Sequence, residues 1–267
     1  MKLAFCSISA LDRSLEDAAA VAAGAGLAGL ELTARPPHLD PEAGEDAARD
    51  AGRAVRGAGV EVTAYGSYLG RPGLTAPEHV EREVAIAAAL EAPLLRVWAE
   101  PLPASGDDRA PVLEWLRRAC DAAAPLGIDV VVERHIGSFA DTPERVERLL
   151  DEAERDNLAL NYQVLDLLPP DEVDGQAADC SRLVPRARYF HLKNYRPNPE
   201  AGGRLLPGGS LEGGVLDYRA ILGAAVKAGY AGPMTFEFLS FEKRPVEDKL
   251  ADDAAFVRGV LAELGEV

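Results

Sequence analysis

Short apolar runs alternate with amphipathic stretches along the whole chain. Runs such as VEVTAY and IDVVVE are dominated by branched apolar side chains, which is typical of buried strands. The predicted strands cover residues 2–8, 29–33, 60–65, 93–98, 128–133, 158–163, 187–192 and 232–238. Between them, apolar residues recur at helical spacing and predict helices at residues 14–25, 43–58, 76–90, 109–125, 142–155, 176–183, 217–228 and 246–264.

The predicted helix boundaries carry their own signals. Ser14 is followed three residues later by Asp17, and Thr142 is followed by Pro143 and Glu144, as in the first turn of many helices. Several helices end at a glycine just before the next strand, as at Gly59, Gly127 and Gly229. The phrases AGLAGLEL, GAGVEVTA, LGIDVVVE and AGYAGPMTFE repeat this return from helix to strand.

Eight such strand–helix units in a row predict a closed (β/α)8 barrel, which typically needs about 250 residues. We expect the 267 residues to form this barrel as a single domain, 1–267. An open, doubly wound sheet is the alternative. No GxGxxG or GxxxxGK[ST] motif follows the first predicted strand, so the usual phosphate-binding glycine loop of that fold is missing.

Composition and charge limit the classes of partner that the chain is expected to bind. The chain is 48% hydrophobic and 27% charged, with a net charge of -16, which favours a small-molecule ligand and opposes binding to nucleic acid. The apolar runs are too short to cross a membrane. Cys6, Cys120 and Cys180 are widely spaced with no CxxC motif, and they are expected to be reduced thiols in a cytoplasmic protein. The sequence is compatible with a homo-oligomer.

Four polar residues stand at the ends of apolar runs in the second half of the chain: Glu133, Gln163, His191 and Glu237. A lone Glu at a strand end can simply reach solvent, and a lone His there is often a core residue with satisfied hydrogen bonds. Two acids at equivalent ends of two core strands favour a functional site. Two carboxylates, an imidazole and an amide oxygen are suitable ligands for one divalent metal ion.

Two further features lie close to these residues in sequence. Lys193 shares the face of His191 if the strand continues, so it can bind an anionic or hydroxyl group of a ligand; the alternative is a loop lysine. The segment 195–216 is rich in Gly and Pro, including Pro197, Pro199, Gly202, Gly203, Gly208 and Gly209. We expect it to form an irregular lid over the carboxyl-terminal mouth of the barrel and to contact bound ligand.

At these positions the sequence resembles the xylose isomerase-like barrels, which include sugar-phosphate isomerases and ketose 3-epimerases. The resemblance covers nearly the whole chain and is strongest from residue 93 onward. It is carried by LLRVWAE, VVVERH at 130–135, ARYFHLKN at 187–194, LEGGVLDY and GYAGPMTFE.

The resemblance implies one divalent ion, with Mn²⁺ favoured and Mg²⁺, Co²⁺ or Zn²⁺ as alternatives. Members supply a Glu, an Asp, a His and a second Glu, and Glu133, His191 and Glu237 match three of these positions. The sixth strand departs from the usual Asp-x-x-His, because Gln163 and Asp166 stand there instead. Gln163 is expected to replace the carboxylate ligand with an amide oxygen.

The resemblance also implies residues that face the substrate. Arg96 and His135 match such positions, and Asp166 replaces a His that often holds substrate hydroxyl groups. Trp98 and Tyr65 lie near the ends of their strands and can pack against the apolar face of a sugar, or serve as core aromatics.

The implied activity is that of an isomerase or epimerase. Such an enzyme moves a proton next to the carbonyl of a sugar or sugar phosphate through an enediolate, with Glu133 and Glu237 as acid and base. The altered sixth strand keeps two alternatives open: a keto-inositol dehydratase-like lyase, and a non-catalytic or partner-dependent sugar-binding barrel. A nuclease similar to endonuclease IV is opposed by the acidic charge and by a total of only four histidines.

Overall fold

Eight parallel strands close into a barrel in the computed structural model, which describes residues 1–100, 108–201 and 203–265. The strand order around the barrel is β1-β10-β7-β6-β5-β4-β3-β2. The strands are β1 (Leu3–Cys6), β2 (Gly29–Thr33), β3 (Glu61–Gly66), β4 (Leu94–Val97), β5 (Asp129–Glu133), β6 (Leu158–Tyr162), β7 (Ala187–Leu192) and β10 (Met234–Phe236). Closure between β1 and β10 confirms the predicted (β/α)8 barrel and excludes the open sheet.

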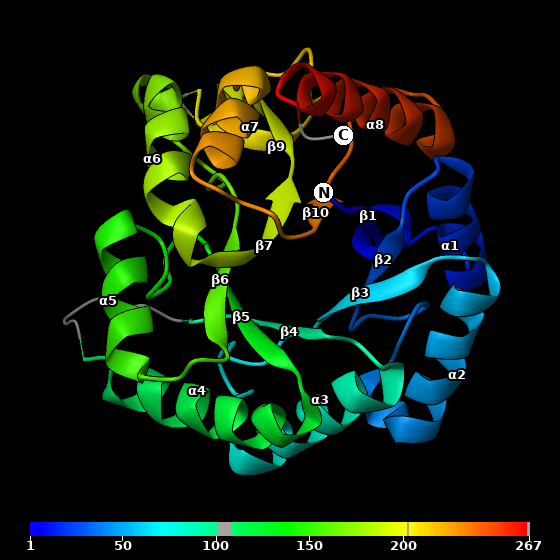
Figure 1. Ribbon diagram of the computed structural model, residues 1–267, viewed down its shortest axis with the longest axis vertical. Helices are drawn as coiled ribbons and strands as arrows, with labels where there is room; N and C mark the ends of the chain where they lie inside the picture. The colour runs from blue at the N-terminus through cyan, green and yellow to red at the C-terminus, as the bar shows by residue number, and fades with distance from the viewer. Residues whose placement is uncertain (101–107, 202, 266–267) are drawn as a thin grey trace.

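A ring of α-helices surrounds this barrel (Figure 1). In the described parts of the chain the helices are α1 (Leu15–Gly24), α2 (Gly44–Gly57), α3 (Pro77–Leu90), α4 (Ala110–Ala123), α5 (Pro143–Ala153), α6 (Gln176–Leu183), α7 (Tyr218–Lys227) and α8 (Val246–Glu263). The expected caps are present, since Ser14 accepts a hydrogen bond from the Asp17 amide and Thr142 accepts one from Arg145. Each helix lies within the span that the sequence pattern predicts for it, apart from one- or two-residue differences at its ends.

Two apolar layers result from the alternation of side chains along the strands. A small cluster of Ala64, Leu94, Val131, Ala159 and Tyr189 fills part of the barrel interior. A much larger cluster lies between the strands and the surrounding helices. Because the interior is packed, ligands can reach only its ends, and the strand ends that carry polar residues define the candidate site.

The segment 195–216 is more regular than predicted. It contains most of an antiparallel hairpin formed by β8 (Asn194–Pro197) and β9 (Leu205–Gly209), so the expectation of an irregular wall was wrong. Tyr195 and Leu205 are buried and anchor the hairpin. Gly208 has a φ of +122°, and a Cβ there would overlap Phe241, so this glycine permits a close contact within ordered structure. Gly202 lies outside the described residues.

The hairpin is attached to loops that follow two barrel strands. The Tyr195 hydroxyl donates to the Val164 carbonyl at 2.5 Å, in the loop after β6. The Phe241 amide, after β10, donates to the Gly208 carbonyl at 3.0 Å. The hairpin therefore lies at the carboxyl-terminal end of the barrel, on the side where the candidate ligands end their strands; contact with a bound ligand stays a prediction.

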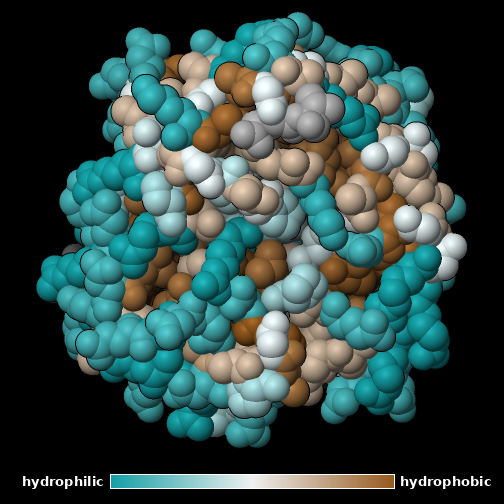
Figure 2. Space-filling view, in the orientation of Figure 1, coloured by the Kyte–Doolittle hydropathy of each residue, from teal (hydrophilic) through white to brown (hydrophobic). Residues whose placement is uncertain are grey.

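Hydrophilic residues dominate the periphery of the face in Figure 2, and hydrophobic residues are visible between them nearer its centre. Within the described residues, no helix combines the length and apolar character needed to cross a membrane.

The loop after β3 makes a close backbone contact that can be tested. Gly70 has a φ of +92°, and a Cβ there would lie 1.7 Å from the Trp98 carbonyl oxygen. Gly73 in the same loop has a φ of +82° and open space around it. Both alanine substitutions should lower the free energy of unfolding, Gly73→Ala by about 1–2 kcal/mol. Gly70→Ala should cost a further ~1–3 kcal/mol because the backbone must move. Equal losses in denaturant titrations would contradict this contact.

Asp253 on α8 holds the segment that follows the hairpin. Its carboxylate accepts a hydrogen bond from the Leu211 amide at 2.8 Å, and burial raises its pKa to about 6. The folded state therefore binds this proton more tightly than the unfolded chain, and its stabilising contribution is lost as pH rises from about 4 to about 6.

Asp253→Asn keeps an acceptor oxygen without the charge. The difference in unfolding free energy between Asn and wild type should grow by up to ~3 kcal/mol in favour of Asn between pH 4 and pH 7. Urea titrations at both pH values measure it. If the difference in unfolding free energy does not change with pH, Asp253 is not the cause of the predicted pH dependence.

Candidate active site

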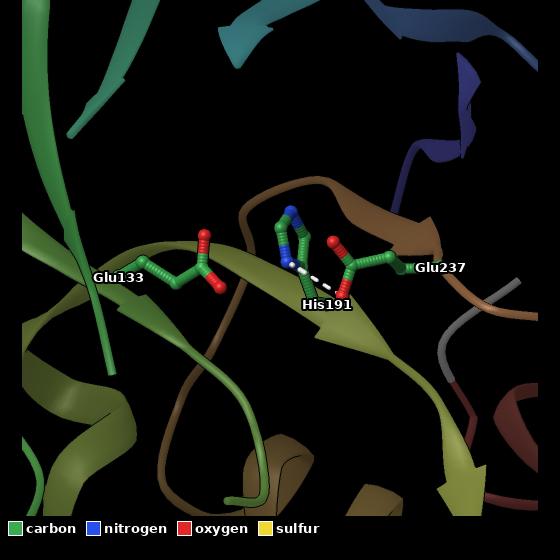
Figure 3. A group of neighbouring side chains, drawn as sticks. All are labelled: Glu133, His191 and Glu237. Atoms are coloured by element: carbon green, nitrogen blue, oxygen red, sulfur yellow. Dashed lines mark ion pairs between the residues drawn. The ribbon is translucent and has the colours of Figure 1, made fainter. Parts of the chain in front are cut away.

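Three candidate ligands converge at the carboxyl-terminal end of the barrel. Glu133 is the last residue of β5, His191 lies in β7, and Glu237 directly follows β10. One ligand atom from each lies within 4.8 Å of the other two, and all three residues are buried. Figure 3 shows the two carboxylates on opposite sides of the His191 ring and directed toward it. The pairing of β7 with β10, with Thr235 opposite His191, places His191 and Glu237 together.

Gln163 joins this group just after β6. Its Nε2 donates to Glu133 Oε1 at 2.8 Å and to the Arg134 carbonyl at 2.7 Å. Both partners are acceptors, so these contacts fix which end of the amide is the nitrogen. The amide oxygen therefore faces His191, with Gln163 Oε1 3.3 Å from Nδ1.

Glu31 is a member of the site that the sequence analysis missed. It lies in β2, its side chain is fully buried, and Glu31 Oε2 is 2.6 Å from His191 Nε2. A signal was present, because GLELT places a carboxylate within an apolar strand as VVVE does. Such a buried acid requires a partner. Glu31 was overlooked because apolar residues continue beyond it.

The charges in the site depend strongly on one another. Burial opposes protonation of His191, but Glu31 and then Glu237 outweigh it and raise the pKa of His191 to about 10. Burial likewise opposes ionisation of Glu31 and Glu237, yet the charge of His191 lowers the pKa of both carboxyl groups. When no metal ion is bound, the protonated ring of His191 therefore supplies the positive charge that balances the buried carboxylates of Glu31 and Glu237.

Two buried cations complete the electrostatics. Arg96 Nη1 lies 3.1 Å from Glu133 Oε2, and Lys193 Nζ lies 3.1 Å from Asp166 Oδ1 and 3.2 Å from Glu237 Oε2. Burial opposes the charge of Lys193, but Asp166 and then Glu237 raise its pKa. Lys193 and Asp166 thus lie beside the convergent residues; their contact with a substrate stays a prediction.

The remaining predicted substrate residues divide into two groups. Trp98 and His135 contact each other, with ring centroids 4.5 Å apart, and the Arg96 guanidinium lies 5.2 Å from the Trp98 ring centroid. They therefore border the site. Tyr65 points away from it, since its hydroxyl donates to Glu83 Oε2 on α3 at 2.7 Å. This placement corrects the interpretation of Tyr65 as a sugar platform; it is a core aromatic of the outer layer.

The barrel fold of the chain agrees with its match to a protein family. Residues 19–260 match the family model described as xylose isomerase-like TIM barrel. The chain belongs to this family. Its candidate ligands thus lie on the barrel face that carries active sites in TIM-barrel enzymes.

Two curated relatives carry functional names. An inosose dehydratase from Geobacillus thermodenitrificans is 28% identical over 136 residues, which cover 45% of this chain and 44% of the relative. An L-ribulose 3-epimerase from Methylomonas sp. is 29% identical over 156 residues, which cover 57% and 49%. The matches therefore span about half the length of each curated relative. They support an enzyme whose relatives include epimerases and dehydratases.

Solved structures show the same fold over nearly the whole chain. A D-allulose 3-epimerase from Methylomonas sp. superposes with a TM-score of 0.74 and 20% identity, covering 98% of both chains. A xylose isomerase-like TIM barrel protein from Mycobacterium smegmatis, in complex with magnesium, has a TM-score of 0.67 and 16% identity, covering 93% of this chain and 88% of that one. At these identities the similarity concerns the fold.

Proposed function

We propose that this protein is a metal-dependent isomerase or epimerase that acts on a sugar or sugar phosphate. The convergence of Glu133, His191 and Glu237 at the active-site end of the barrel carries this proposal. The epimerases among the relatives of the chain support the reaction class. The buried, unpaired cysteines Cys6, Cys120 and Cys180 are consistent with a reducing, cytoplasmic location.

The donor set suits a divalent ion held by Glu133, Gln163, His191 and Glu237. Glu133 Oε2 and Glu237 Oε2 are buried and lie 3.1 and 3.2 Å from the cationic groups of Arg96 and Lys193. Neither oxygen accepts a well-aligned hydrogen bond from the described residues, so each keeps lone pairs for a metal ion. The amide oxygen of Gln163 faces the same place. When bound, the ion would act as a Lewis acid that polarises the substrate carbonyl. We favour Mn²⁺, with Mg²⁺, Co²⁺ or Zn²⁺ as alternatives.

The charge of the site also supports a divalent ion. Counted at their formal charges, Glu31, Glu133, Asp166 and Glu237 contribute four negative charges, and Arg96 and Lys193 contribute two positive charges. With His191 neutral, as a metal ligand must be, these residues sum to −2. One divalent ion balances this charge, which a buried site requires.

The carboxylates of Glu133 and Glu237 would transfer the proton. Glu133 and Glu237 approach His191 from opposite sides (Figure 3), so one carboxylate is available to each face of a substrate bound beside the ring. One carboxylate would remove the proton from the carbon beside the carbonyl, and the other would return a proton to the opposite face. The positive charge of Lys193, whose Nζ lies 3.2 Å from Glu237 Oε2, favours the carboxylate form that a base requires.

Neighbouring side chains would bind and orient the substrate. Lys193 can donate to a substrate oxygen and stabilise the negative charge that develops there, while Asp166 can accept from a hydroxyl group. Arg96 Nη1 lies 3.1 Å from Glu133 Oε2 and holds this carboxylate in place. Trp98 and His135 offer an aromatic edge for the apolar face of a sugar. The β8–β9 hairpin would form the adjoining wall.

A keto-inositol dehydratase is the second candidate, favoured by the match to an inosose dehydratase. It requires the same removal of a proton beside a carbonyl, followed by loss of a hydroxyl group as water. The two reactions differ in their products, so one experiment can separate them.

Exchange in D₂O tests the reaction. Metal-loaded protein, mixed with a panel of ketoses, sugar phosphates and inososes, should introduce deuterium beside the carbonyl of at least one compound, as detected by NMR. Glu133→Gln and Glu237→Gln should each lower this rate by about 10²–10⁴-fold, because each removes an acid–base group. Glu83→Gln, which changes a buried acid outside the site, should leave it unchanged.

The products then decide between candidates. Exchange with inversion at the carbon beside the carbonyl supports the epimerase. Exchange with loss of water from the compound supports the dehydratase. Absence of exchange across the panel would leave only the non-catalytic or partner-dependent sugar-binding barrel as an interpretation. Full activity in Glu133→Gln would instead show that Glu133 is not an acid–base group.

Gln163→Asp tests the altered ligand. It adds a carboxylate beside the proposed ion and should raise the affinity for Mn²⁺ by at least about tenfold in calorimetric titrations. It also removes the donor to Glu133 and Arg134, so the metal-free variant should lose ~1–3 kcal/mol of stability. Asn has the same length as Asp but carries no charge, so Gln163→Asn should not raise the affinity for Mn²⁺. If Asp and Asn bind Mn²⁺ equally, Gln163 is not a ligand position.

A further inference from the structure

Glu31 and His191 meet across the barrel interior although 160 residues separate them in sequence. Glu31 Oε2 lies 2.6 Å from His191 Nε2, and both side chains are fully buried. β2 and β7 are not neighbours in the sheet, because β1 and β10 lie between them. The contact therefore spans the carboxyl-terminal end of the barrel instead of following a strand ladder.

The two nitrogens of the His191 ring have different surroundings. Nε2 faces Glu31, whereas Nδ1 faces Gln163 Oε1 at 3.3 Å and Glu237 Oε2 at 3.5 Å. Asn161 Nδ2 is 3.3 Å from both ring nitrogens, which places it beside the ring and not along either lone pair. Only Nδ1 thus points toward the proposed metal ligands.

A histidine that ligates a metal must present one unprotonated nitrogen in a fixed direction. The tautomer is normally fixed by an acceptor that binds the proton on the other nitrogen, and loss of such an acceptor typically weakens metal binding by about 10–100-fold. A carboxylate serves this purpose better than an amide, because an amide can also donate and stabilise the opposite tautomer.

We infer that Glu31 is a positioning residue that holds the proton of His191 on Nε2 and directs Nδ1 at the divalent ion. This inference rests on the proposed metal-dependent function. The contact geometry of the two ring nitrogens carries this inference.

An alternative explanation for Glu31 is that it only neutralises Arg96. The distances favour His191: Glu31 Oε1 lies 3.5 Å from Arg96 Nε, and within the described residues neither atom makes a well-formed hydrogen bond. Arg96 makes its closer ion pair with Glu133, at 3.1 Å. A role limited to Arg96 would not affect the tautomer of His191, which gives the test its readout.

The first measurement is the affinity for Zn²⁺, which is diamagnetic and accepts imidazole ligands. Wild type, Glu31→Gln and Glu83→Gln are titrated with Zn²⁺ by calorimetry, after circular dichroism has shown that each is folded. Glu31→Gln should bind about 10–100-fold more weakly. Glu83 is the matched control, because it is a buried Glu that bonds Tyr65 in the outer layer. Its variant should bind like wild type.

The second measurement is the tautomer of His191 in Zn²⁺-loaded protein, read from ¹⁵N NMR. With four histidines in the chain, one spectrum of His191→Ala assigns the signal. Wild type should carry the proton on Nε2 and coordinate through Nδ1. Glu31→Gln should show a mixture of tautomers or loss of the coordinated signal.

The outcomes separate the inference from the function on which it rests. If wild type binds Zn²⁺ and Glu31→Gln binds it equally well with the same tautomer, the role of Glu31 is wrong and the metal site stands. If wild-type His191 coordinates through Nε2, the role is wrong whether or not the variant folds. If wild type binds no divalent ion, the proposed function fails and the role of Glu31 fails with it.

Discussion

Pairing of buried charges is the constraint on which the carboxyl-terminal end of this barrel depends. Glu31, Glu133 and Glu237 are buried where an isolated carboxylate would be strongly destabilising. Each lies within ion-pair distance of a cationic side chain: His191 for Glu31, Arg96 for Glu133, and Lys193 for Glu237. Removal of one partner would leave an uncompensated charge, so these residues are expected to act as one unit.

The closed barrel makes this pairing available. The charged residues come from β2, β4, β5, β7 and the end of β10, and closure between β1 and β10 leaves only these two strands between β2 and β7. Packed side chains fill the interior below them, including Tyr189, which bonds Thr235. The charges are therefore held at one end of a rigid support, where a ligand can approach between the loops. The same arrangement would position acid–base groups on two sides of a substrate.

Much of the fold could be predicted because strand and helix periods are local properties of sequence. The positions of Glu133, His191 and Glu237 at strand ends were local too, and closure of the barrel then brings them together. The orientation of Tyr65 could not be predicted from its neighbours in sequence. It depends on the face of β3 on which the side chain lies, and β2 and β3 pair with a register shift. The β8–β9 hairpin was missed because Gly and Pro permit close contacts as well as irregular loops. Glu31 was missed because its partner, His191, lies on a distant strand.

Anomalous diffraction from crystals grown with Mn²⁺ tests most directly whether the convergent residues hold a metal ion. We expect one strong anomalous peak at the carboxyl-terminal end of the barrel, about 2.0–2.4 Å from oxygen atoms of Glu133 and Glu237 and from Nδ1 of His191. A site that stays without a peak at saturating Mn²⁺, with His191 still bridging Glu31 and Glu237, would contradict it.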